Sequence, residues 1–383
     1  MKKFISVLLS AVMLFAFCSV GVSADNSDTL KFDENGSFRI LQIADIQDGP
    51  LLKSATENFM RDVLAETDPD LVVLTGDNIS GGDCWTDGLT KIAIHRYMSI
   101  FEEYGVPVAA VFGNHDSEGP SNKEEMMKMY ESYDCFVGCE GEDLTGCGNY
   151  NLPVMSSDGS KIAYNIWCID SLTYNRHPES KRDVAYYEND LKGYACVHKD
   201  QIDWYVKTSN ELKAANGGKA VPSMMFQHII VPEIYDALVK TESGYVLPDG
   251  NNGELWESPC PPEYSNGQFD AIVNQGDVVA MFFGHDHKNN FVVPYKGVDL
   301  VNTPGVGFAS YGGENRGARI IDISEDDTST YTTEVIKWRE FYDVENNPAE
   351  YNRFIYSGNE FSFGEQVEAF FRFVFAKVAE IFA

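Results

Sequence analysis

Short apolar runs that each end at a cluster of polar residues constrain the fold of this chain more than any other feature. Residues 38–44, 71–74 and 106–112 are such runs, rich in β-branched side chains, and the pattern is typical of buried parallel strands. Two helix-length segments, residues 51–66 and 89–104, lie between them with apolar side chains at helical spacing. The alternation predicts an α/β sheet whose chemistry lies beyond the carboxyl ends of its strands.

The second half of the chain contains a series of strand candidates, and the later ones follow one another without helices between them. The candidates are residues 161–169, 221–226, 278–283, 291–293, 298–302, 318–323 and 331–337. Because strands that follow one another directly tend to pair antiparallel, we expect an antiparallel sheet that packs on the first sheet. Residues 346–358 are expected to form a loop ahead of a separate C-terminal helix.

The first residues of the chain have the composition of a secretory signal peptide. Lys2 and Lys3 precede an apolar run at residues 4–18, and small residues at 22–24 offer a cleavage site. The run is short for a membrane span, and no later segment reaches the roughly 18 to 20 apolar residues of a transmembrane helix. We therefore expect residues 1–24 to be a signal peptide and the mature chain to be secreted or extracytoplasmic.

The chain is strongly acidic, which bears on the partners it can bind. Its 383 residues include 59 Asp and Glu against 29 Lys and Arg, a formal net charge of -30. A surface of this sign repels the phosphate backbone of DNA or RNA and gains nothing from counterion release. We therefore expect no nucleic-acid partner.

Cysteine usage predicts one disulfide. Seven cysteines follow the expected cleavage site, and an odd number leaves at least one thiol free or paired between chains. Cys135, Cys139 and Cys147 lie together in a glycine-rich stretch with no histidine nearby, which favours a disulfide that staples a loop over a metal site. Cys168 lies in an apolar run and is expected to be a buried thiol.

Five polar clusters, each directly after a predicted strand, carry the residues best suited to chemistry. They are Asp45-Ile46-Gln47, Gly76-Asp77-Asn78, Gly113-Asn114-His115-Asp116, Gln227-His228 and Gly284-His285-Asp286-His287. Four of the seven histidines of the chain fall in these clusters. Carboxylate, imidazole and amide oxygen together are ligands of divalent ions such as Mn, Fe and Zn. A lone Gly-Asp-Asn is typical of a turn, but the ordered set of five predicts a metal centre at the strand ends.

The order of the five clusters resembles the calcineurin-like metallophosphoesterase superfamily, whose pattern is D-x-H, G-D, G-N-H-D/E, H and G-H-x-H. The resemblance covers roughly residues 38–323, and the stretches TGDNISG, FQHIIVPE and FGHDHKNN are most similar to the purple-acid-phosphatase-like branch. It implies an α/β fold of two packed mixed β-sheets flanked by helices, a four-layer sandwich. The catalytic domain would span residues 25–345, and a linker with a C-terminal amphipathic helix would span residues 346–383.

The same resemblance implies a pair of divalent metal ions and assigns a role to each cluster. The first ion would be held by Asp45, Gln47, Asp77 and His287. The second ion would share Asp77 and be held further by Asn114, His228 and His285. His115 would be the catalytic acid and bind neither ion.

Two positions depart from the pattern of the superfamily. Gln47 stands where the pattern has histidine, and its carbonyl oxygen is a harder donor than imidazole, so the first site should favour Mn or Fe(II) over Zn, with Zn still possible. Some Mn-dependent nucleotide diphosphatases of the superfamily also have glutamine there. Ser80 stands where purple acid phosphatases have the tyrosine that follows the bridging aspartate by three residues. Without that tyrosine the purple colour is not expected.

The expected chemistry is hydrolysis of a small phosphorylated substrate. Two ions about 3.5 to 4 Å apart would activate a bridging hydroxide and neutralise the phosphoryl oxygens. His115 would protonate the leaving oxygen, which for such a group contributes about 10²- to 10⁴-fold. Arg316 and Arg319 are candidate phosphate partners, with a plain structural position as the alternative. His177 and His198 flank a polar insertion that could border the substrate.

Several functions remain open from the sequence. A phosphomonoesterase fits best, and a phosphodiesterase or a Mn-dependent nucleotide diphosphatase is the alternative within the superfamily. A non-catalytic extracellular binding protein with a degenerate site is the alternative outside enzymes, and only Gln47 favours it. A serine hydrolase is excluded because the chain has no Gly-x-Ser-x-Gly elbow.

The C-terminal tail, residues 365–383, is predicted to be an amphipathic helix, since its valine and phenylalanine residues recur at spacings of three and four. The helix could pack on the catalytic domain as a closing element. It could also dock on a membrane surface or another protein. Its charges are nearly balanced, so an anionic membrane would gain little from electrostatics.

Overall fold

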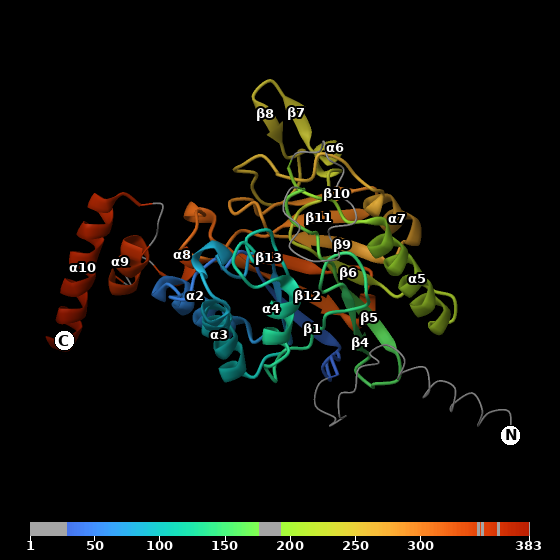
Figure 1. Cartoon of the computed structure of the whole chain (residues 1–383), viewed down its shortest axis with the longest axis horizontal. Helices are drawn as coiled ribbons and strands as arrows, with labels where there is room; N and C mark the ends of the chain where they lie inside the picture. The colour runs from blue at the N-terminus through green and yellow to red at the C-terminus, as the bar shows by residue number, and fades with distance from the viewer. Residues whose placement is uncertain (1–28, 176–192, 343–344, 346–347, 358–360, 383) are drawn as a thin grey trace.

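Two β-sheets pack face to face in the middle of the molecule, and helices cover their outer faces (Figure 1). The computed structural model describes residues 29–175, 193–342, 345, 348–357 and 361–382. The arrangement confirms the expected four-layer α/β sandwich. The proposed signal peptide at residues 1–24 lies outside the described residues.

The first sheet has five strands in the order β13-β12-β1-β2-β3. Their bounds are β1 Ser37–Ile43, β2 Leu71–Thr75, β3 Val108–Val111, β12 Gly317–Ser324 and β13 Thr332–Lys337. β1, β2 and β3 are parallel, as predicted, while β12 and β13 continue the sheet antiparallel. The last two strands of the chain therefore return to the first sheet instead of joining a separate one.

The second sheet has six strands in the order β10-β11-β9-β6-β5-β4. Their bounds are β4 Tyr150–Met155, β5 Ile162–Cys168, β6 Ser223–Phe226, β9 Val278–Phe283, β10 Val292–Tyr295 and β11 Val298–Asn302. The prediction of an antiparallel sheet is wrong for its centre, because β5, β6, β9 and β11 are parallel neighbours. Crossover helices α5 (Lys199–Ala215) and α7 (Gln268–Gln275), which the sequence reading missed, make these parallel connections possible.

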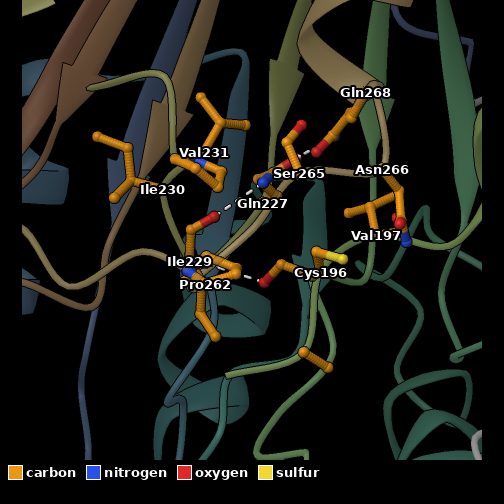
Figure 2. Close-up of a pocket in the computed structure, with 13 residues that line it drawn as sticks. Cys196, Val197, Gln227, Ile229, Ile230, Val231, Pro262, Ser265, Asn266 and Gln268 are labelled. Atoms are coloured by element: carbon orange, nitrogen blue, oxygen red, sulfur yellow. Dashed lines mark hydrogen bonds between the residues drawn. The ribbon is translucent and has the colours of Figure 1, made fainter. Parts of the chain in front are cut away.

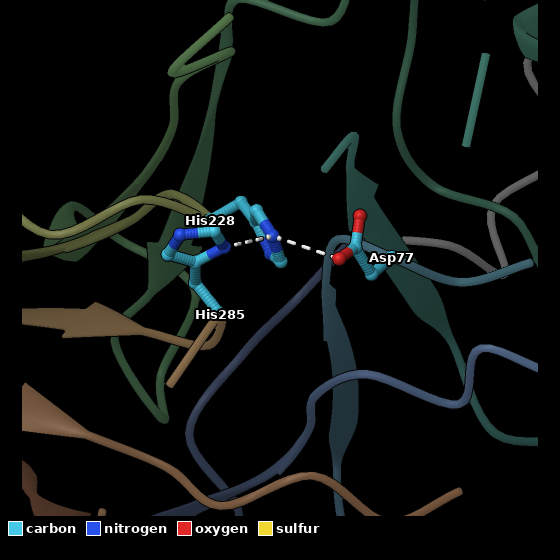
Figure 3. Close-up of side chains that lie close together, drawn as sticks. All are labelled: Asp77, His228 and His285. Atoms are coloured by element: carbon cyan, nitrogen blue, oxygen red, sulfur yellow. Dashed lines mark hydrogen bonds and ion pairs between the residues drawn. The ribbon is translucent and has the colours of Figure 1, made fainter. Parts of the chain in front are cut away.

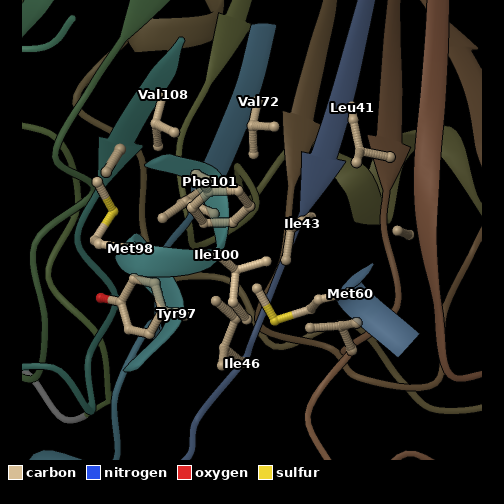
Figure 4. Packing of buried hydrophobic residues seen from close by; sticks show 14 of the residues in the cluster. Leu41, Ile43, Ile46, Met60, Val72, Tyr97, Met98, Ile100, Phe101 and Val108 are labelled. Carbon is tan, nitrogen blue, oxygen red and sulfur yellow. The ribbon is translucent and has the colours of Figure 1, made fainter. Parts of the chain in front are cut away.

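Helices α2 (Ser54–Thr67), α3 (Asp87–Tyr104) and α4 (Lys123–Tyr130) cover the first sheet. α3 begins where the Thr86 side chain accepts the Leu89 N–H and ends at Gly105 in a left-handed conformation (φ 68°). Figure 4 shows Ile100 and Phe101 of this helix directed at the sheet, among Leu41, Ile43, Val72 and Val108. Burial of this face fixes the helices on the sheet and thereby the loops that leave its strands.

Alternate residues of the first sheet face the second sheet and form the central layer of the core. Phe38 and Ile40 of β1 pack in one cluster with Phe226 of β6 and Phe282 of β9. Gln42 continues this face as a buried polar residue, and its amide donates to the Thr75 hydroxyl at 3.0 Å and to the Phe283 carbonyl at 3.1 Å. Its hydrogen bonds join the two sheets close to the point where β1, β2 and β9 end.

The C-terminal region is more helical than predicted. It contains α8 (Trp338–Phe341), α9 (Pro348–Ser357) and α10 (Phe363–Phe382), so the loop expected at residues 346–358 is wrong. Phe354 of α9 is buried against Phe308, Trp338 and Tyr342, which anchors α9 on the sandwich. α10 packs on α9 and stands at the edge of the molecule (Figure 1). No helix in the described part of the chain is long and apolar enough to cross a membrane.

The cysteines do not form the predicted loop staple. Cys135 and Cys147 are free thiols, so no disulfide can join any two of Cys135, Cys139 and Cys147. Cys168 is a buried free thiol, as expected from its apolar run. The loop that contains the three cysteines is held by backbone hydrogen bonds instead, such as Gly148 N–H to the Glu140 carbonyl at 2.9 Å.

Candidate metal centre

The five polar clusters meet where strands of both sheets end. Asp45 and Asp77 follow β1 and β2, and Asn114 follows β3, all in the first sheet. His228 follows β6 and the Gly284–His287 cluster follows β9, both in the second sheet. Residues that lie 240 positions apart, Asp45 and His285, are thereby joined by a hydrogen bond of 3.1 Å from the His285 backbone N–H to Oδ2 of Asp45. The centre therefore takes its side chains from both sheets.

Two groups of side chains are placed so that each could hold a metal ion. One consists of Asp77, His228 and His285, and the other of Asp45, Asp77 and His287. Within each group the ligand atoms all lie within 4.8 Å of one another. Figure 3 shows the first group, with both imidazole rings turned toward the Asp77 carboxylate. Asp77 belongs to both groups, which is the position of a bridging ligand.

Short contacts connect the candidate ligands. Nε2 of His228 lies 3.2 Å from Oδ2 of Asp77 and 3.2 Å from Oδ1 of Asn114. Nδ1 of His285 lies 3.2 Å from Nε2 of His228, and Nε2 of His287 lies 3.3 Å from Oδ1 of Asp45. The structure thus brings together six of the seven predicted ligands, and Gln47 is described separately below.

Backbone carbonyls set the tautomers of two histidines. Nδ1 of His228 lies 2.8 Å from the Thr75 carbonyl, and Nδ1 of His287 lies 2.8 Å from the Tyr311 carbonyl. Since a carbonyl only accepts, each Nδ1 carries a proton, so in the neutral form of each ring the lone pair of Nε2 would face the centre. Partners of this kind hold the second nitrogen of metal-binding histidines in proteins.

Asn114 is oriented in the same way by a tyrosine that the sequence reading did not identify. Its amide Nδ2 donates to the Tyr174 hydroxyl at 3.0 Å, which turns the carbonyl Oδ1 toward His228. The Tyr174 ring stacks on Tyr194 with centroids 5.2 Å apart, and Tyr194 in turn meets the His285 ring edge to face at 4.6 Å. Two tyrosines thus support two candidate ligands of the second ion.

The backbone of the centre is strained. Asp45, Gln47, Asp77 and His285 have φ values of 53°, 41°, 48° and 70°, a region that residues other than glycine seldom adopt. Conformations of this kind cost about 1 to 3 kcal/mol each and gather at functional sites. The strain falls on four motif residues, and its concentration here is independent support for a functional role.

Glycines beside the ligands provide room more than backbone freedom. Glycine directly precedes Asp77, Asn114 and His285, yet only Gly76 has a positive φ (85°), while Gly113 and Gly284 do not. A Cβ atom on Gly113 would lie 2.2 Å from Oδ1 of Asp77, and one on Gly284 would lie 2.7 Å from Oδ2 of Asp45. These two positions must be glycine because the carboxylates pass so close to the backbone.

Charges within the centre shift the pKa values of its histidines. Burial alone would lower the pKa of His228, but the Asp77 carboxylate beside it raises that pKa to about 9. Burial is likewise outweighed at His287, where Asp45 raises the pKa. Burial and the neighbouring charge of His228 instead lower the pKa of His285 well below its ordinary value. A divalent ion binds to neutral imidazole, so its binding would release the proton of any charged ring.

Gln47 tests whether the donor set fits a metal ion. Its Oε1 is buried and has no hydrogen-bond partner in the described structure, although an unpaired buried polar group costs about 1 to 3 kcal/mol. The residue is also held in a left-handed conformation, and its backbone N–H donates to the Asp77 carbonyl at 2.9 Å. A buried amide oxygen with free lone pairs, on a residue whose backbone is bonded to Asp77, suits a metal ligand at this position, so the residues present fit two divalent ions.

His115 lies at the mouth of the centre, where about a third of its side chain is exposed. Its backbone N–H donates to Oδ1 of Asp77 at 2.7 Å, and its Nδ1 lies 2.8 Å from the Glu118 carboxylate. Burial lowers the pKa of His115, but the charges of Asp77 and Glu118 together raise it above its ordinary value. Glu118 was not identified from the sequence, although its place three residues after a motif histidine could have suggested it.

Asp116 has a structural role, which the sequence did not indicate. Its buried carboxylate accepts the backbone N–H groups of Asn78 at 2.9 Å, Ile79 at 3.1 Å and Gly113 at 2.6 Å. These bonds join the loop after β2 to the loop after β3. Asp116 therefore fixes the distance between Asp77 and Asn114 without touching either side chain.

The two candidate phosphate-binding arginines do not face the centre, which supports the structural alternative for both. Arg316 is buried, donates to the carbonyls of Gly307 and Ser310, and lies over the Phe308 ring at 4.3 Å. Arg319 is also buried, and its guanidinium is engaged by other polar atoms of the core. Its acceptors are the Thr303 hydroxyl at 2.9 Å and the Asn290 and Asn302 carbonyls at 2.8 Å each. Both arginines support loops instead of binding substrate.

The next candidates from the sequence are the two histidines that flank the polar insertion. His177 lies outside the described residues. His198 is buried at the start of α5, where its backbone N–H donates to the Gln201 side chain at 2.8 Å. A small pocket nearby (Figure 2) is lined by residues such as Val197, Gln227 and Gln268 and by no candidate metal ligand. It is separate from the centre.

Comparisons with known proteins agree with this geometry. Residues 38–289 match the family of calcineurin-like phosphoesterases. The chain is 27% identical over 361 residues to "Probable inactive purple acid phosphatase 14" of Arabidopsis thaliana. The matched region covers 85% of this chain and 85% of that protein. It is 29% identical over 327 residues to "Probable inactive purple acid phosphatase 29" of the same plant, covering 77% of this chain and 78% of that one.

A solved structure shares the fold. A dimetal phosphatase from Danio rerio superposes with a TM-score of 0.52 at 14% identity and covers 78% of this chain and 98% of its own. At this identity the likeness concerns the fold alone. Together with the match over residues 38–289 and the convergence of the five clusters, it leads to one conclusion: the chain belongs to the calcineurin-like phosphoesterase family.

Proposed function

We propose that this protein is a secreted phosphomonoesterase that hydrolyses small phosphate esters at a pair of divalent ions, with Mn or Fe favoured and Zn possible. The observation that carries the proposal is the placement of Asp77 in both candidate ligand groups. Membership of the phosphoesterase family supports the reaction class. The basic and apolar residues at the N-terminus support secretion.

The chain's own residues divide into those that hold ions and those that handle the substrate. Asp45, Gln47, Asp77 and His287 would hold the first ion. Asp77, Asn114, His228 and His285 would hold the second ion. When bound, two such ions activate water and neutralise the phosphoryl oxygens. Tyr174 and the carbonyls of Thr75 and Tyr311 keep three of these ligands in orientation.

His115 would pass a proton to the leaving oxygen. It touches the centre through its backbone only, so its imidazole is free to meet a substrate. Because Glu118 engages Nδ1, the remaining Nε2 is the atom that can reach the leaving group. The raised pKa of His115 favours the protonated form that this step requires.

A single phosphoryl group is favoured over a diphosphate. Arg316 and Arg319, which could have neutralised a second phosphate, are buried and engaged by carbonyls. Glu118 places a carboxylate beside the centre, where it would repel additional negative charge on the substrate. A Mn-dependent nucleotide diphosphatase is the second candidate. It is favoured only by Gln47, because some of those enzymes also have glutamine at this position.

The plant relatives are named inactive, so activity is the point to test. A catalytically silent binding protein would not need the strained ligand conformations or the room left by Gly113 and Gly284. The purified protein should contain two metal ions per chain and, with Mn, should hydrolyse p-nitrophenyl phosphate faster than its bis-ester or ADP-ribose. Two bound ions with no hydrolysis of any of the three would support the binding protein. A preference for ADP-ribose would support the diphosphatase.

A further inference from the structure

A fully buried ion pair joins Lys123, at the start of α4, to Asp170, just beyond the end of β5. Nζ of Lys123 lies 3.0 Å and 3.2 Å from the two carboxylate oxygens of Asp170, and both side chains are 0% exposed. Removing two charges from water is costly, and their attraction offsets this cost only where further hydrogen bonds complete the group. We therefore looked for the contacts that keep this pair in place.

The Asp170 carboxylate has such further hydrogen bonds. Oδ1 also accepts the Leu172 N–H at 2.9 Å, and Oδ2 also accepts the Cys147 N–H at 2.9 Å. A side chain would not fit at Gly146, because its Cβ atom would lie 2.7 Å from Oδ2. The carboxylate thus ties three segments together, which are α4, the loop of residues 145–149 and the loop that follows β5.

The loop that follows β5, residues 169–174, is called the β5 loop below. The main chain of Asp170 is held there as well, because its N–H donates to Oδ1 of Asn149 at 3.1 Å and its carbonyl accepts Nε2 of Gln201, from α5, at 2.8 Å. Leu172 has a φ of 65°, a left-handed conformation that leucine seldom adopts. Since the Leu172 N–H is bonded to the Asp170 carboxylate, the ion pair supports this strained turn.

The β5 loop carries the groups that hold Asn114, a candidate ligand of the second ion. The Tyr174 hydroxyl accepts Nδ2 of Asn114 at 3.0 Å, and the Thr173 hydroxyl lies 3.5 Å from the Asn114 carbonyl. The loop thereby meets Asn114 at both its side chain and its backbone. A shift of the β5 loop would therefore turn the amide oxygen that Asn114 offers to a metal ion.

The same loop reaches the surroundings of both histidines of the second ion. Oγ of Ser171 accepts the N–H of Ile229, the residue directly after His228, at 2.9 Å. The tyrosine of the β5 loop stacks on Tyr194, whose ring meets the His285 ring edge to face with centroids 4.6 Å apart. All three ligands that belong only to the second ion are thus supported from this loop.

Ligands that belong only to the first ion are held from other segments. Nδ1 of His287 lies 2.8 Å from the Tyr311 carbonyl, and the two rings stack with centroids 4.2 Å apart. The Asp45 N–H donates to the Gly76 carbonyl, directly after β2, at 3.1 Å. Tyr311 lies between β11 and β12. The supports of the two ions therefore come from different parts of the chain.

We propose that the Lys123–Asp170 ion pair is a positioning device for the second metal ion. The pair fixes the β5 loop, and the loop fixes Asn114 and the surroundings of His228 and His285. Neither residue of the pair would touch the ion or the substrate. The inference rests on the proposed pair of ions, and its consequence is that the second ion can be weakened while the first is kept.

Metal titration of Asp170→Asn is the central experiment. The amide keeps the size of the carboxylate but loses its charge beside Lys123 and one of the oxygens that accept N–H groups. Groups that support metal ligands contribute about 10- to 100-fold to metal affinity, so calorimetry of the metal-free variant with Mn should show one of the two ions bound at least about tenfold more weakly. Metal content after buffer exchange should fall from two ions per chain to one. Two ions bound as tightly as in the parent would overturn the inference.

Ligand variants identify which ion is weakened. Asn114→Leu removes a ligand of the second ion only, and Gln47→Leu removes a ligand of the first ion only. Added to Asn114→Leu, the change Asp170→Asn should cause little further loss of metal. Added to Gln47→Leu, it should leave the protein with almost no bound metal. The opposite pattern, or equal loss in both backgrounds, would overturn the inference.

Asp277→Asn is the matched control, because it also removes a buried carboxylate. Asp277 accepts the hydroxyls of Tyr205 and Ser209 and directly precedes β9, whereas His285 lies beyond the other end of that strand. The six residues of β9 span roughly 20 Å. Asp277→Asn should therefore keep both ions. Loss of one ion in this control as well would mean that any damage to the core removes it, and would overturn the inference.

A neutral pair covers the case in which Asp170→Asn does not fold because the Lys123 charge is left buried alone. The double variant Lys123→Met with Asp170→Asn removes both charges, and unchanged circular dichroism shows that it folds. Its second ion should still be weakened, because the amide cannot accept both the Leu172 and the Cys147 N–H as the carboxylate does. A double variant that holds both ions as tightly as the parent would overturn the inference.

The parent protein separates this inference from the proposed function. If the parent bound fewer than two ions per chain, the proposed metal pair would be wrong and the inference would be overturned with it. If the parent bound two ions and Asp170→Asn bound them equally well, the metal pair would stand and only the role of the ion pair would be overturned.

Discussion

Asp77 and His115 are joined by a hydrogen bond, yet we expect substitutions of the two residues to have different effects. Asp77 is shared by both ligand groups, so Asp77→Asn should remove bound metal and hydrolysis together. His115 touches the centre only through its backbone, so His115→Ala should keep two ions and lower kcat by about 10²- to 10⁴-fold. Metal analysis beside steady-state kinetics distinguishes the two. Equal loss of metal in both variants would show that the roles are assigned wrongly.

Glu118 should act through the orientation of His115. Glu118→Gln removes the charge next to Nδ1 but keeps a group that can accept a hydrogen bond. We expect kcat to fall about tenfold for alkyl phosphates, which need a proton on the leaving oxygen, and little for p-nitrophenyl phosphate, which does not. KM should stay nearly constant.

The pH profile provides a second measurement on the same variant. The Glu118 charge raises the pKa of His115, so its removal should move the alkaline limb of kcat to lower pH, because the imidazole loses its proton earlier. An alkaline limb that does not move in Glu118→Gln would mean that Glu118 has only a structural part.

Gln47 should decide the metal preference of the first site. Its unpaired amide oxygen is a harder donor than imidazole, so the parent should be more active with Mn than with Zn, and Gln47→His should reduce or reverse this order. Activities measured after reloading the metal-free protein with each ion provide the comparison. Equal activity of the parent with Mn and Zn would contradict the argument.

Among the elements, those that end in a motif could be predicted well, and the connecting elements could not. The strands that carry Asp45, Asp77 and His285 were located within about two residues, because buried parallel strands are short, continuous apolar runs. α5 and α7 were missed because their apolar residues are mixed with charged ones, and without them the parallel centre of the second sheet could not be foreseen. α9 was missed as well, because a helix in which Phe354 is the only fully buried aromatic side chain has a weak apolar pattern.

Phe354 should therefore determine whether α9 stays on the sandwich. Phe354→Ala removes a buried ring from the group formed with Phe308, Trp338 and Tyr342, and should lower the free energy of unfolding by about 3 to 5 kcal/mol. Phe371→Ala on the exposed side of α10 is the control and should change it by less than about 0.5 kcal/mol. Urea unfolding followed by tryptophan fluorescence measures both. Similar values for the two would mean that α9 is not anchored as described.

In the whole molecule, the sequence predicted the layers and the convergence of the clusters but not the contacts that support them. The order of the motifs can be read from the sequence, so the proximity of Asp45 and His287 could be expected. The bonds from Tyr174 and Glu118 depend on loop conformation, which no periodicity encodes. For Arg316 and Arg319 the sequence left open both a phosphate contact and a structural position, because it shows their charge but not their burial.

Metal binding should also be visible in the stability of the whole protein. A ligand present at 100 times its Kd stabilises the folded state by about 2.7 kcal/mol, which for a chain of this size corresponds to roughly 3 to 4 °C in Tm. Chelation should therefore lower the Tm of the parent by this amount and leave that of Asp77→Asn unchanged. If the Tm of the parent did not change with the chelator, this would contradict a metal-binding centre.

The origin of the ligands in both sheets has a consequence for how long the protein resists proteolysis. Asp45, Asp77 and Asn114 follow strands of one sheet, whereas His228, His285 and His287 follow strands of the other, so each ion would act as a clasp across the sandwich. Proteases cut chains that open. If the protein is secreted and active as proposed, and the clasp closes only when metal is supplied, the metal content of the surroundings would set how long the protein survives as well as how fast it works.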